Sequence, residues 1–376
     1  MPFEIGQTVG SYRLIQQMGQ GGMATVYKAY HAALDRYVAI KVLHPVFTED
    51  ASFLARFQRE AKTVARLEHP NIVPIYDYAE FEGRPYLVMK FIEGETLKAR
   101  MARGELSQEE ILNITQAVGN ALAYAHQNKI LHRDIKPSNV LLANDGQIYL
   151  ADFGLARMAQ SGESSLTADR LIGTPQYMSP EQALSKPNLD ARTDIYSFGV
   201  MLYEMLVGRV PFNADTPFAV IHDHIYTPLP LPRQVKPDLP EAVERVLLKA
   251  LAKNPDDRFT DVTELVSALE KAFSEAETIA LVPAESAPAV VTETVPPPEP
   301  LPETPATETA PPAISRDPPQ KKRPKTGLII GGAVALLLLL AFCIMVTIRF
   351  VQNRNLQRLK VPTLTPPVHE VATPVQ

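Results

Sequence analysis

HRDIKPSN occupies residues 132–139 of the chain and is followed by DFG at residues 152–154. This spacing places the carboxylate of Asp134 where it can accept a proton. It also places the amide of Asn139 and the carboxylate of Asp152 where their oxygens can hold divalent cations, since hard cations prefer oxygen ligands. The sequence between the two motifs, VLLANDGQIYLA, has the pattern of a short hairpin.

Three further motifs flank this pair in a fixed order. A glycine-rich turn, GQGGMATV, occupies residues 19–26, VAIK occupies residues 38–41, and SPE occupies residues 179–181. Glycines suit a turn that lies over phosphates, because a Cβ atom there would block the approach of the backbone. Each motif alone is weak evidence, but five motifs in this order and at these spacings leave little room for coincidence.

The pattern outside the motifs predicts a strand-rich region followed by a helix-rich region, with a cleft between them where ligands bind. Strands are expected at residues 12–18, 25–30, 37–43, 73–78 and 85–91. Helices are expected at residues 51–67, 109–128, 193–207, 217–225, 241–252 and 261–273. A chain of 376 residues with 45% hydrophobic content can form a sizeable core, but residues beyond 273 do not have a globular composition.

At the motifs quoted above, the chain closely resembles the protein kinase family. HRDIKPSN, GTPQYMSPE and GQGGMATVY are most similar to the bacterial members of its eukaryotic-type (Hanks-type) Ser/Thr branch. The resemblance covers residues 12–273 and implies an α+β, bilobal protein kinase fold with a β-rich N-lobe and a helical C-lobe. It also implies a Ser/Thr protein kinase that transfers the γ-phosphoryl group of ATP to protein hydroxyls, chiefly by positioning and charge neutralisation.

The resemblance implies catalytic roles for four side chains. Asp134 is expected to orient the substrate hydroxyl and accept its proton, and Lys136 is expected to steady the transferring phosphate. Lys41 is expected to hold the α- and β-phosphates while pairing with Glu60 in QREAKTVARL, although Glu68 lies nearby in the sequence. Lys136, together with Thr174 in GTPQY, favours Ser/Thr over Tyr specificity.

The implied cofactors are ATP and Mg²⁺, with Mn²⁺ as an alternative, and the implied metal ligands are Asn139 and Asp152. Two departures from the family pattern concern the nucleotide site: Ala24 stands at the third glycine position, and Lys90 stands in the hinge where relatives often have glutamate. The expected nucleotide-binding residues are Met18, Gly19, Gly21, Gly22, Ala24, Val26, Ala39, Lys41, Met89, Ile92 and Leu141.

Further residues match scaffold and regulatory positions of the family. Glu181 and Arg258 match a buried structural ion pair, and Asp194 matches a helix residue that braces the catalytic loop. Arg133, beside Asp134, implies control by an activation loop at residues 155–178. Thr167 is the expected phosphosite, with the neighbouring serines as alternatives.

The remainder of the chain predicts a membrane anchor. Residues 274–326 are rich in proline and predict a disordered juxtamembrane linker; a spacer is favoured over a proline-motif docking site or a phosphorylated regulatory segment. Residues 327–349 predict one transmembrane helix, because the run from Gly327 to Ile348 carries no charge. Residues 350–376 then form a short extracytoplasmic tail.

Charges on the two sides of the predicted span are nearly balanced, so the positive-inside rule does not fix its orientation. The need for ATP and the absence of a signal-peptide pattern at the N-terminus place the kinase domain in the cytoplasm, with the protein single-pass in the plasma membrane. Expected partners are protein substrates, the membrane and, as a candidate, a second copy for trans-autophosphorylation.

Composition argues against several other classes. The net charge of −5 gives no nucleic-acid footprint, and the single cysteine, Cys343, excludes an intramolecular disulfide and a cysteine-based zinc site. Two alternatives share part of the motif set: a small-molecule kinase and a catalytically inactive scaffold. The SPE segment and the long activation loop argue against the first, and the presence of Lys41, Asp134, Asn139 and Asp152 argues against the second.

Overall fold

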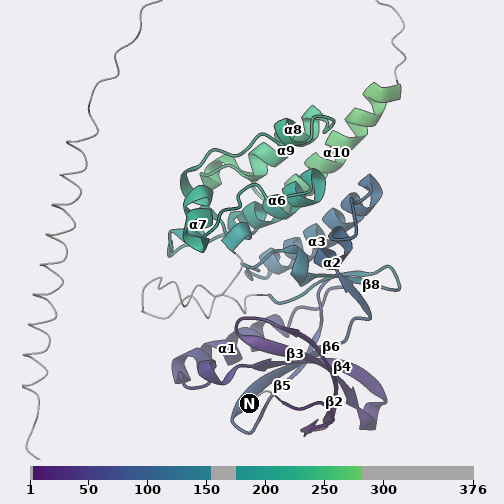
Figure 1. The fold of residues 1–376 in the computed structure, drawn as a ribbon, viewed down its shortest axis with the longest axis vertical. Helices are drawn as coiled ribbons and strands as arrows, with labels where there is room; N and C mark the ends of the chain where they lie inside the picture. The colour runs from purple at the N-terminus through teal and green to yellow at the C-terminus, as the bar shows by residue number, and fades with distance from the viewer. Residues whose placement is uncertain (1–2, 154–174, 282–376) are drawn as a thin grey trace, which may run out of the picture. The chain divides into compact units, whose positions relative to one another are not determined.

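The computed structural model describes residues 3–153 and 175–281, which form a strand-rich N-lobe and a helix-rich C-lobe (Figure 1). The N-lobe contains a six-stranded antiparallel sheet with strand order β1-β2-β3-β4-β6-β5. Its strands are β1 (Thr8–Val9), β2 (Tyr12–Gln20), β3 (Ala24–His31), β4 (Arg36–Leu43), β5 (Ile75–Phe81) and β6 (Arg84–Lys90).

Alternation along β4 gives the N-lobe sheet two different faces, because successive side chains of a strand point to opposite sides. Val38, Ile40 and Val42 belong to one buried cluster. Leu43 belongs to another cluster with the apolar side of helix α1 (Ala51–Val64). Lys41 shares the parity of Leu43, so β4 directs its ammonium to the face that α1 covers.

The C-lobe contains a small sheet and the remaining described helices. The strands β7 (Gly94–Thr96), β8 (Val140–Ala143) and β9 (Ile148–Leu150) pair in that order. The helices are α2 (Leu97–Met101), α3 (Gln108–Gln127), α5 (Pro180–Ala183), α6 (Ala191–Val207), α7 (Pro217–Tyr226), α8 (Pro232–Val235), α9 (Glu241–Ala250) and α10 (Val262–Leu281).

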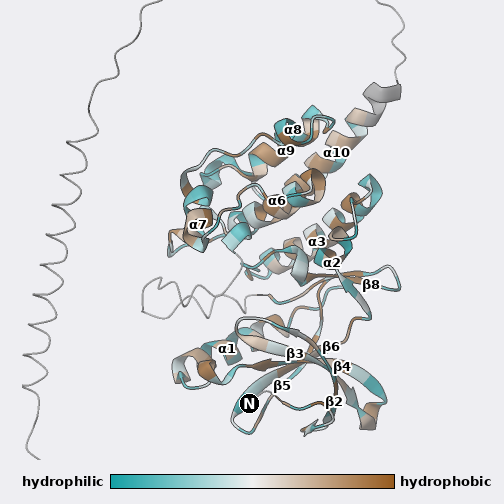
Figure 2. Cartoon of the chain, in the orientation of Figure 1, coloured by the Kyte–Doolittle hydropathy of each residue, from teal (hydrophilic) through white to brown (hydrophobic). Residues whose placement is uncertain are grey.

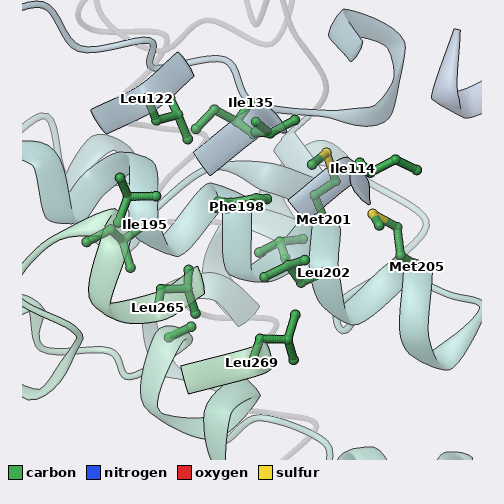
Figure 3. Packing of buried hydrophobic residues seen from close by; sticks show 14 of the residues in the cluster. Ile114, Leu122, Ile135, Ile195, Phe198, Met201, Leu202, Met205, Leu265 and Leu269 are labelled. Carbon is green, nitrogen blue, oxygen red and sulfur yellow. The ribbon is translucent and has the colours of Figure 1, made fainter. Parts of the chain in front are cut away.

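Helix α6 lies at the centre of the C-lobe core and is buried along most of its length. Figure 3 shows Phe198 and Met201 of α6 among side chains of α3 and α10. Ile135 of the catalytic loop enters the same cluster and has no exposed surface. The residue next to Asp134 is therefore anchored in the buried core of the C-lobe. Hydropathy colouring shows the apolar stretches of these helices alternating with polar ones (Figure 2).

Most predicted elements occur near their expected positions, with two instructive differences. The strand expected at residues 73–78 begins only at Ile75, because Val73 donates its N–H to the carbonyl of Leu150 and so joins the C-lobe. Helix α10 continues to Leu281, past the predicted domain end at Phe273. The sequence SEAETIAL contains no proline or glycine and consists mostly of good helix formers.

Several predictions concern residues outside the described part of the chain. These are Thr167 and most of the activation loop, the linker beyond residue 281, the span at residues 327–349 and the tail at residues 350–376. Among the helices at residues 3–153 and 175–281, none has the length and apolar character needed to cross a membrane.

Candidate functional site

The segment between α3 and β8 brings together three of the predicted side chains. The Nζ atom of Lys136 lies 2.9 and 2.7 Å from the two carboxylate oxygens of Asp134. The Nδ2 atom of Asn139 donates to the backbone carbonyl of Asp134 at 2.8 Å and to its Oδ2 atom at 3.1 Å. The amide and the ammonium together fix the direction of the Asp134 carboxylate.

Two residues of the site have a left-handed backbone although neither is glycine. Arg133 has φ of 66° and Asp152 has φ of 65°. Such conformations cost about 1–3 kcal/mol each and persist only where the surroundings hold them. Two hydrogen bonds hold the backbone of Arg133 in this conformation. Its N–H donates to Asp194 at 2.7 Å, and its carbonyl accepts from Gln182 at 2.9 Å.

Asp194 of α6 supports the catalytic loop through hydrogen bonds to its backbone. Its carboxylate accepts the N–H groups of His132 and Arg133 and contacts Nε2 of His126 at 2.8 Å. Burial opposes ionisation, but His126 and the loop amides outweigh it and hold the pKa of Asp194 below its usual range. Asp194 thus lies where the sequence places a bracing residue, whereas His126 carried no sequence signal because it pairs with Asp194 across two helices.

Lys41 forms an ion pair with Asp152 at 2.8 Å. Sequence reasoning did not predict this ion pair, and the pairing of Lys41 with Glu60 that it did predict stays a prediction. Burial opposes ionisation of Asp152, but Lys41 and Lys136 outweigh it and lower its pKa. The catalytic role predicted for Glu60 stays a prediction.

Strand register places several of the predicted nucleotide-binding residues on the face that carries Lys41. Val26 lies opposite Lys41 on β3, and Ala39 of β4 lies opposite Met89 of β6. Directly opposed residues of antiparallel strands point to the same side, so these side chains line one surface. Leu141 belongs to β8 in the C-lobe sheet.

The glycine-rich turn joins β2 to β3. Gly19 pairs with Val26 across the two strands, and the N–H of Gly21 donates to the carbonyl of Ala24 at 2.9 Å. A Cβ atom built on Gly19 would meet no described atom within 4 Å, so packing within the described chain does not require glycine there. This open backbone fits close approach by a phosphate group. Of the other predicted positions, Met18 lies on β2 and is 49% exposed, and Gly22 lies in the turn itself.

The hinge follows β6 and includes the unusual Lys90. Its Nζ atom donates to the hydroxyl of Tyr149 at 2.7 Å and lies over the same ring. Its backbone N–H donates to the carbonyl of Pro74. The Lys90 side chain is therefore engaged with β9, and Ile92 continues the hinge toward β7.

Glu181 of α5 and Arg258 form a bidentate salt bridge, with Nη1–Oε1 and Nη2–Oε2 distances of 2.7 and 2.9 Å. Burial disfavours the charged carboxylate, but Arg258 outweighs it and lowers the pKa of Glu181. The remaining polar atoms are also satisfied: Thr193 donates to Glu181, and Arg258 donates to backbone carbonyls that include that of Ala252. The pair ties the start of α5 to the loop after α9.

The donor set suits a small hard cation. Nδ2 of Asn139 bonds to Asp134, so its side-chain carbonyl oxygen is left as a possible metal ligand, and the carboxylate of Asp152 offers further oxygen ligands. At residues 3–153 and 175–281, no group of three or more His, Cys, Asp or Glu side chains is placed to hold a metal. A small number of protein ligands is compatible with Mg²⁺, because this ion commonly keeps several waters and is also bound by the phosphates of the substrate.

The segment after the activation loop supplies residues that sequence reasoning missed. The hydroxyl of Tyr177 donates to Glu204 at 2.5 Å, and Gln182 contacts the catalytic loop. The spacing of Ser179 and Gln182 is a capping-box pattern that could have indicated a helix start. The contact of Gln182 with Arg133 joins residues far apart in sequence, so no local pattern predicts it.

Comparison with known proteins identifies the family. The protein kinase domain family matches residues 12–273. The chain therefore belongs to the protein kinase family.

Bacterial serine/threonine kinases are among the proteins that this chain is similar to. The chain is 40% identical over 271 residues to the serine/threonine-protein kinase PrkC of Bacillus subtilis, covering 72% of this chain and 42% of that protein. It is 42% identical over 259 residues to the probable serine/threonine-protein kinase PknB of Lactococcus lactis, covering 68% and 41%. It thus spans about two fifths of the length of these relatives. A crystal structure of the Mycobacterium tuberculosis PknI kinase domain matches with a TM-score of 0.60 and 31% identity, covering 73% of this chain and 100% of that one.

Proposed function

We propose that this protein is a serine/threonine protein kinase that transfers the γ-phosphoryl group of ATP to hydroxyls of protein substrates. The observation that carries the proposal is the arrangement around Asp134. Its carboxylate is oriented by Lys136 and Asn139, and the adjoining loop is held by Asp194. Family membership and the bacterial serine/threonine kinase relatives support the same activity.

The chain's own residues account for the steps of such a transfer. Asp134 accepts the proton of the substrate hydroxyl at a carboxylate oxygen while Lys136 holds that carboxylate in place and offers positive charge to the moving phosphoryl group. Lys41 holds the phosphates from β4. Asn139 and Asp152 would hold Mg²⁺, which would supply positive charge beside the phosphates of ATP, the source of the phosphoryl group.

The activity is controlled, in this proposal, by phosphorylation of the activation loop. Arg133 precedes the catalytic aspartate and carries a cation that a phosphothreonine can pair with. Thr167 is the proposed acceptor, phosphorylated in trans within a transient homodimer. Incubating the full chain with ATP and Mg²⁺ and mapping phosphates by mass spectrometry tests both points. We expect phosphate on serine and threonine residues, Thr167 included, and an initial rate per molecule that rises with protein concentration. Absence of phosphate from Thr167 would contradict the loop assignment. A rate per molecule that does not depend on concentration would contradict transfer in trans.

The proposal includes a membrane anchor at residues 327–349, with the kinase domain in the cytoplasm. The uncharged apolar run from Gly327 to Ile348 supports the anchor, and the need for ATP supports the orientation. Protease added outside intact cells is expected to trim only the last ~25 residues, because a bilayer protects the remainder. In lysed cells the proline-rich segment should be cut first, as its composition favours an open chain. Cleavage of that segment in intact cells contradicts the orientation.

A further inference from the structure

The side chain of Gln182 joins the segment that follows the activation loop to the catalytic loop. Its Nε2 atom donates to the backbone carbonyl of Arg133 at 2.9 Å. Its Oε1 atom accepts the N–H of Ser179 at 3.1 Å, and the N–H of Gln182 donates to Oγ of Ser179 at 3.3 Å. One carboxamide therefore contacts the first turn of α5 and the peptide bond that leads into Asp134.

These contacts require a group that accepts at one end and donates at the other. The N–H of Ser179 needs an acceptor and the carbonyl of Arg133 needs a donor, so the amide orientation is fixed by its two partners. A glutamate in the same place satisfies Ser179 but brings a charged oxygen against the carbonyl of Arg133. A glutamine is thus suited to this position in a way that its isostere is not.

The carbonyl that Gln182 holds belongs to a residue under strain. Arg133 has φ of 66°, and its N–H is held from the other side by Asp194. Asp194 and Gln182 therefore hold opposite ends of the residue immediately before Asp134. Loss of the Gln182 contact leaves the peptide between Arg133 and Asp134 with fewer bonds that hold its orientation: the N–H of Asp134, which donates to Nδ1 of His132 at 3.2 Å, and the neighbouring N–H of Arg133.

We propose that Gln182 is a positioning residue for phosphoryl transfer: it holds the orientation of Asp134 and makes that orientation depend on the ordered state of α5. The inference rests on the proposed kinase activity. Because α5 follows the activation loop directly, the contact gives the loop a direct mechanical connection to the catalytic aspartate.

The Gln182→Glu variant separates this role from a purely structural one. A capping box accepts glutamate as readily as glutamine at this position, so a residue that only caps α5 tolerates the change. A positioning residue does not tolerate the change, because glutamate has no N–H group to donate to the carbonyl of Arg133. In the full chain we expect kcat for a peptide substrate to fall about tenfold or more, with KM for ATP, the fraction of molecules that bind ATP and the melting temperature nearly unchanged.

Two further variants complete the test. Gln116→Glu makes the same change at an exposed position of α3 and should keep wild-type kcat. Gln182→Met keeps the length of the side chain without its polar atoms and should lose kcat as Gln182→Glu does; it decides the matter if the glutamate variant fails to fold. Wild-type kcat in a folded Gln182 variant overturns the inference, whereas an inactive wild-type chain overturns the proposed kinase activity instead.

Discussion

At the scale of single residues, buried charge is tolerated in this protein where every polar atom has a partner. Arg258 and Glu181 are 0% and 5% exposed as side chains, and each also bonds to groups outside the pair. A pair of this kind contributes little net stability, because desolvation offsets attraction. Its loss on one side is costly, since an uncompensated charge is then left in the core.

We therefore expect Glu181→Gln to lower the free energy of unfolding by about 3–5 kcal/mol, because Arg258 keeps its charge without a counter-charge. The double variant Glu181→Met with Arg258→Met should be more stable than Glu181→Gln alone. Urea unfolding followed by circular dichroism measures both. Additive losses in the double variant would show that the two residues act independently.

The same scale shows what sequence could predict about the site. Asp134, Lys136 and Asn139 lie within six consecutive positions, so the local chain path brings them together and their spacing carries the information. The ion pair of Lys41 with Asp152 was not predicted, because the two residues come from different elements. Which carboxylate reaches the ammonium depends on tertiary geometry that spacing does not encode.

At the scale of elements, α7 is fixed to the C-lobe by a buried histidine and a lysine. Nδ1 of His224 contacts the hydroxyl of Tyr196 at 2.9 Å, and its ring meets Phe212 edge-on. Nζ of Lys253 donates to the carbonyls of Asp223 and His224 and so satisfies the C-terminal end of the helix. Burial first, and the nearby Lys253 second, lower the pKa of His224 to about 4.

This arrangement predicts acid sensitivity. Between pH ~6.5 and 4 His224 is neutral when folded but protonated when unfolded, so stability present above pH ~6.5 is lost as pH falls, by at most about 3 kcal/mol. In His224→Asn the melting temperature should fall less over this window, although its value near pH 7 is lower. Differential scanning calorimetry at several pH values measures the two slopes. Equal slopes would assign the acid sensitivity to other groups.

Element boundaries were less predictable than element types. The buried run of β4 and the periodic apolar residues of α3 follow from local pattern and agree with the structure. The start of β5 does not follow from local pattern, because the backbone N–H of Val73 donates to the carbonyl of Leu150 in the other lobe. A long-range hydrogen bond of this kind competes with strand propensity and leaves no trace in the local sequence.

At the scale of the whole molecule, the order of motifs along the chain predicted both lobes. The C-lobe cluster extends to Val64, Leu67 and Ile72 at the end of the N-lobe helix region, where it meets Ile135 and Phe153. The lobes are thus joined by apolar packing next to the catalytic loop. Sequence indicated the lobes through their different periodicities, but not this contact, because its residues come from three separate segments.

The most direct test of the central claim is phosphoryl transfer by the full chain and by its Asp134→Asn variant. The variant keeps the size of the side chain but removes the carboxylate that accepts the substrate proton, which is expected to lower the rate about a hundredfold or more. Wild-type and variant protein are incubated with ATP and Mg²⁺, and phosphoserine and phosphothreonine are quantified by mass spectrometry. We predict incorporation in the wild type and almost none in a folded variant; equal incorporation in both would contradict the account.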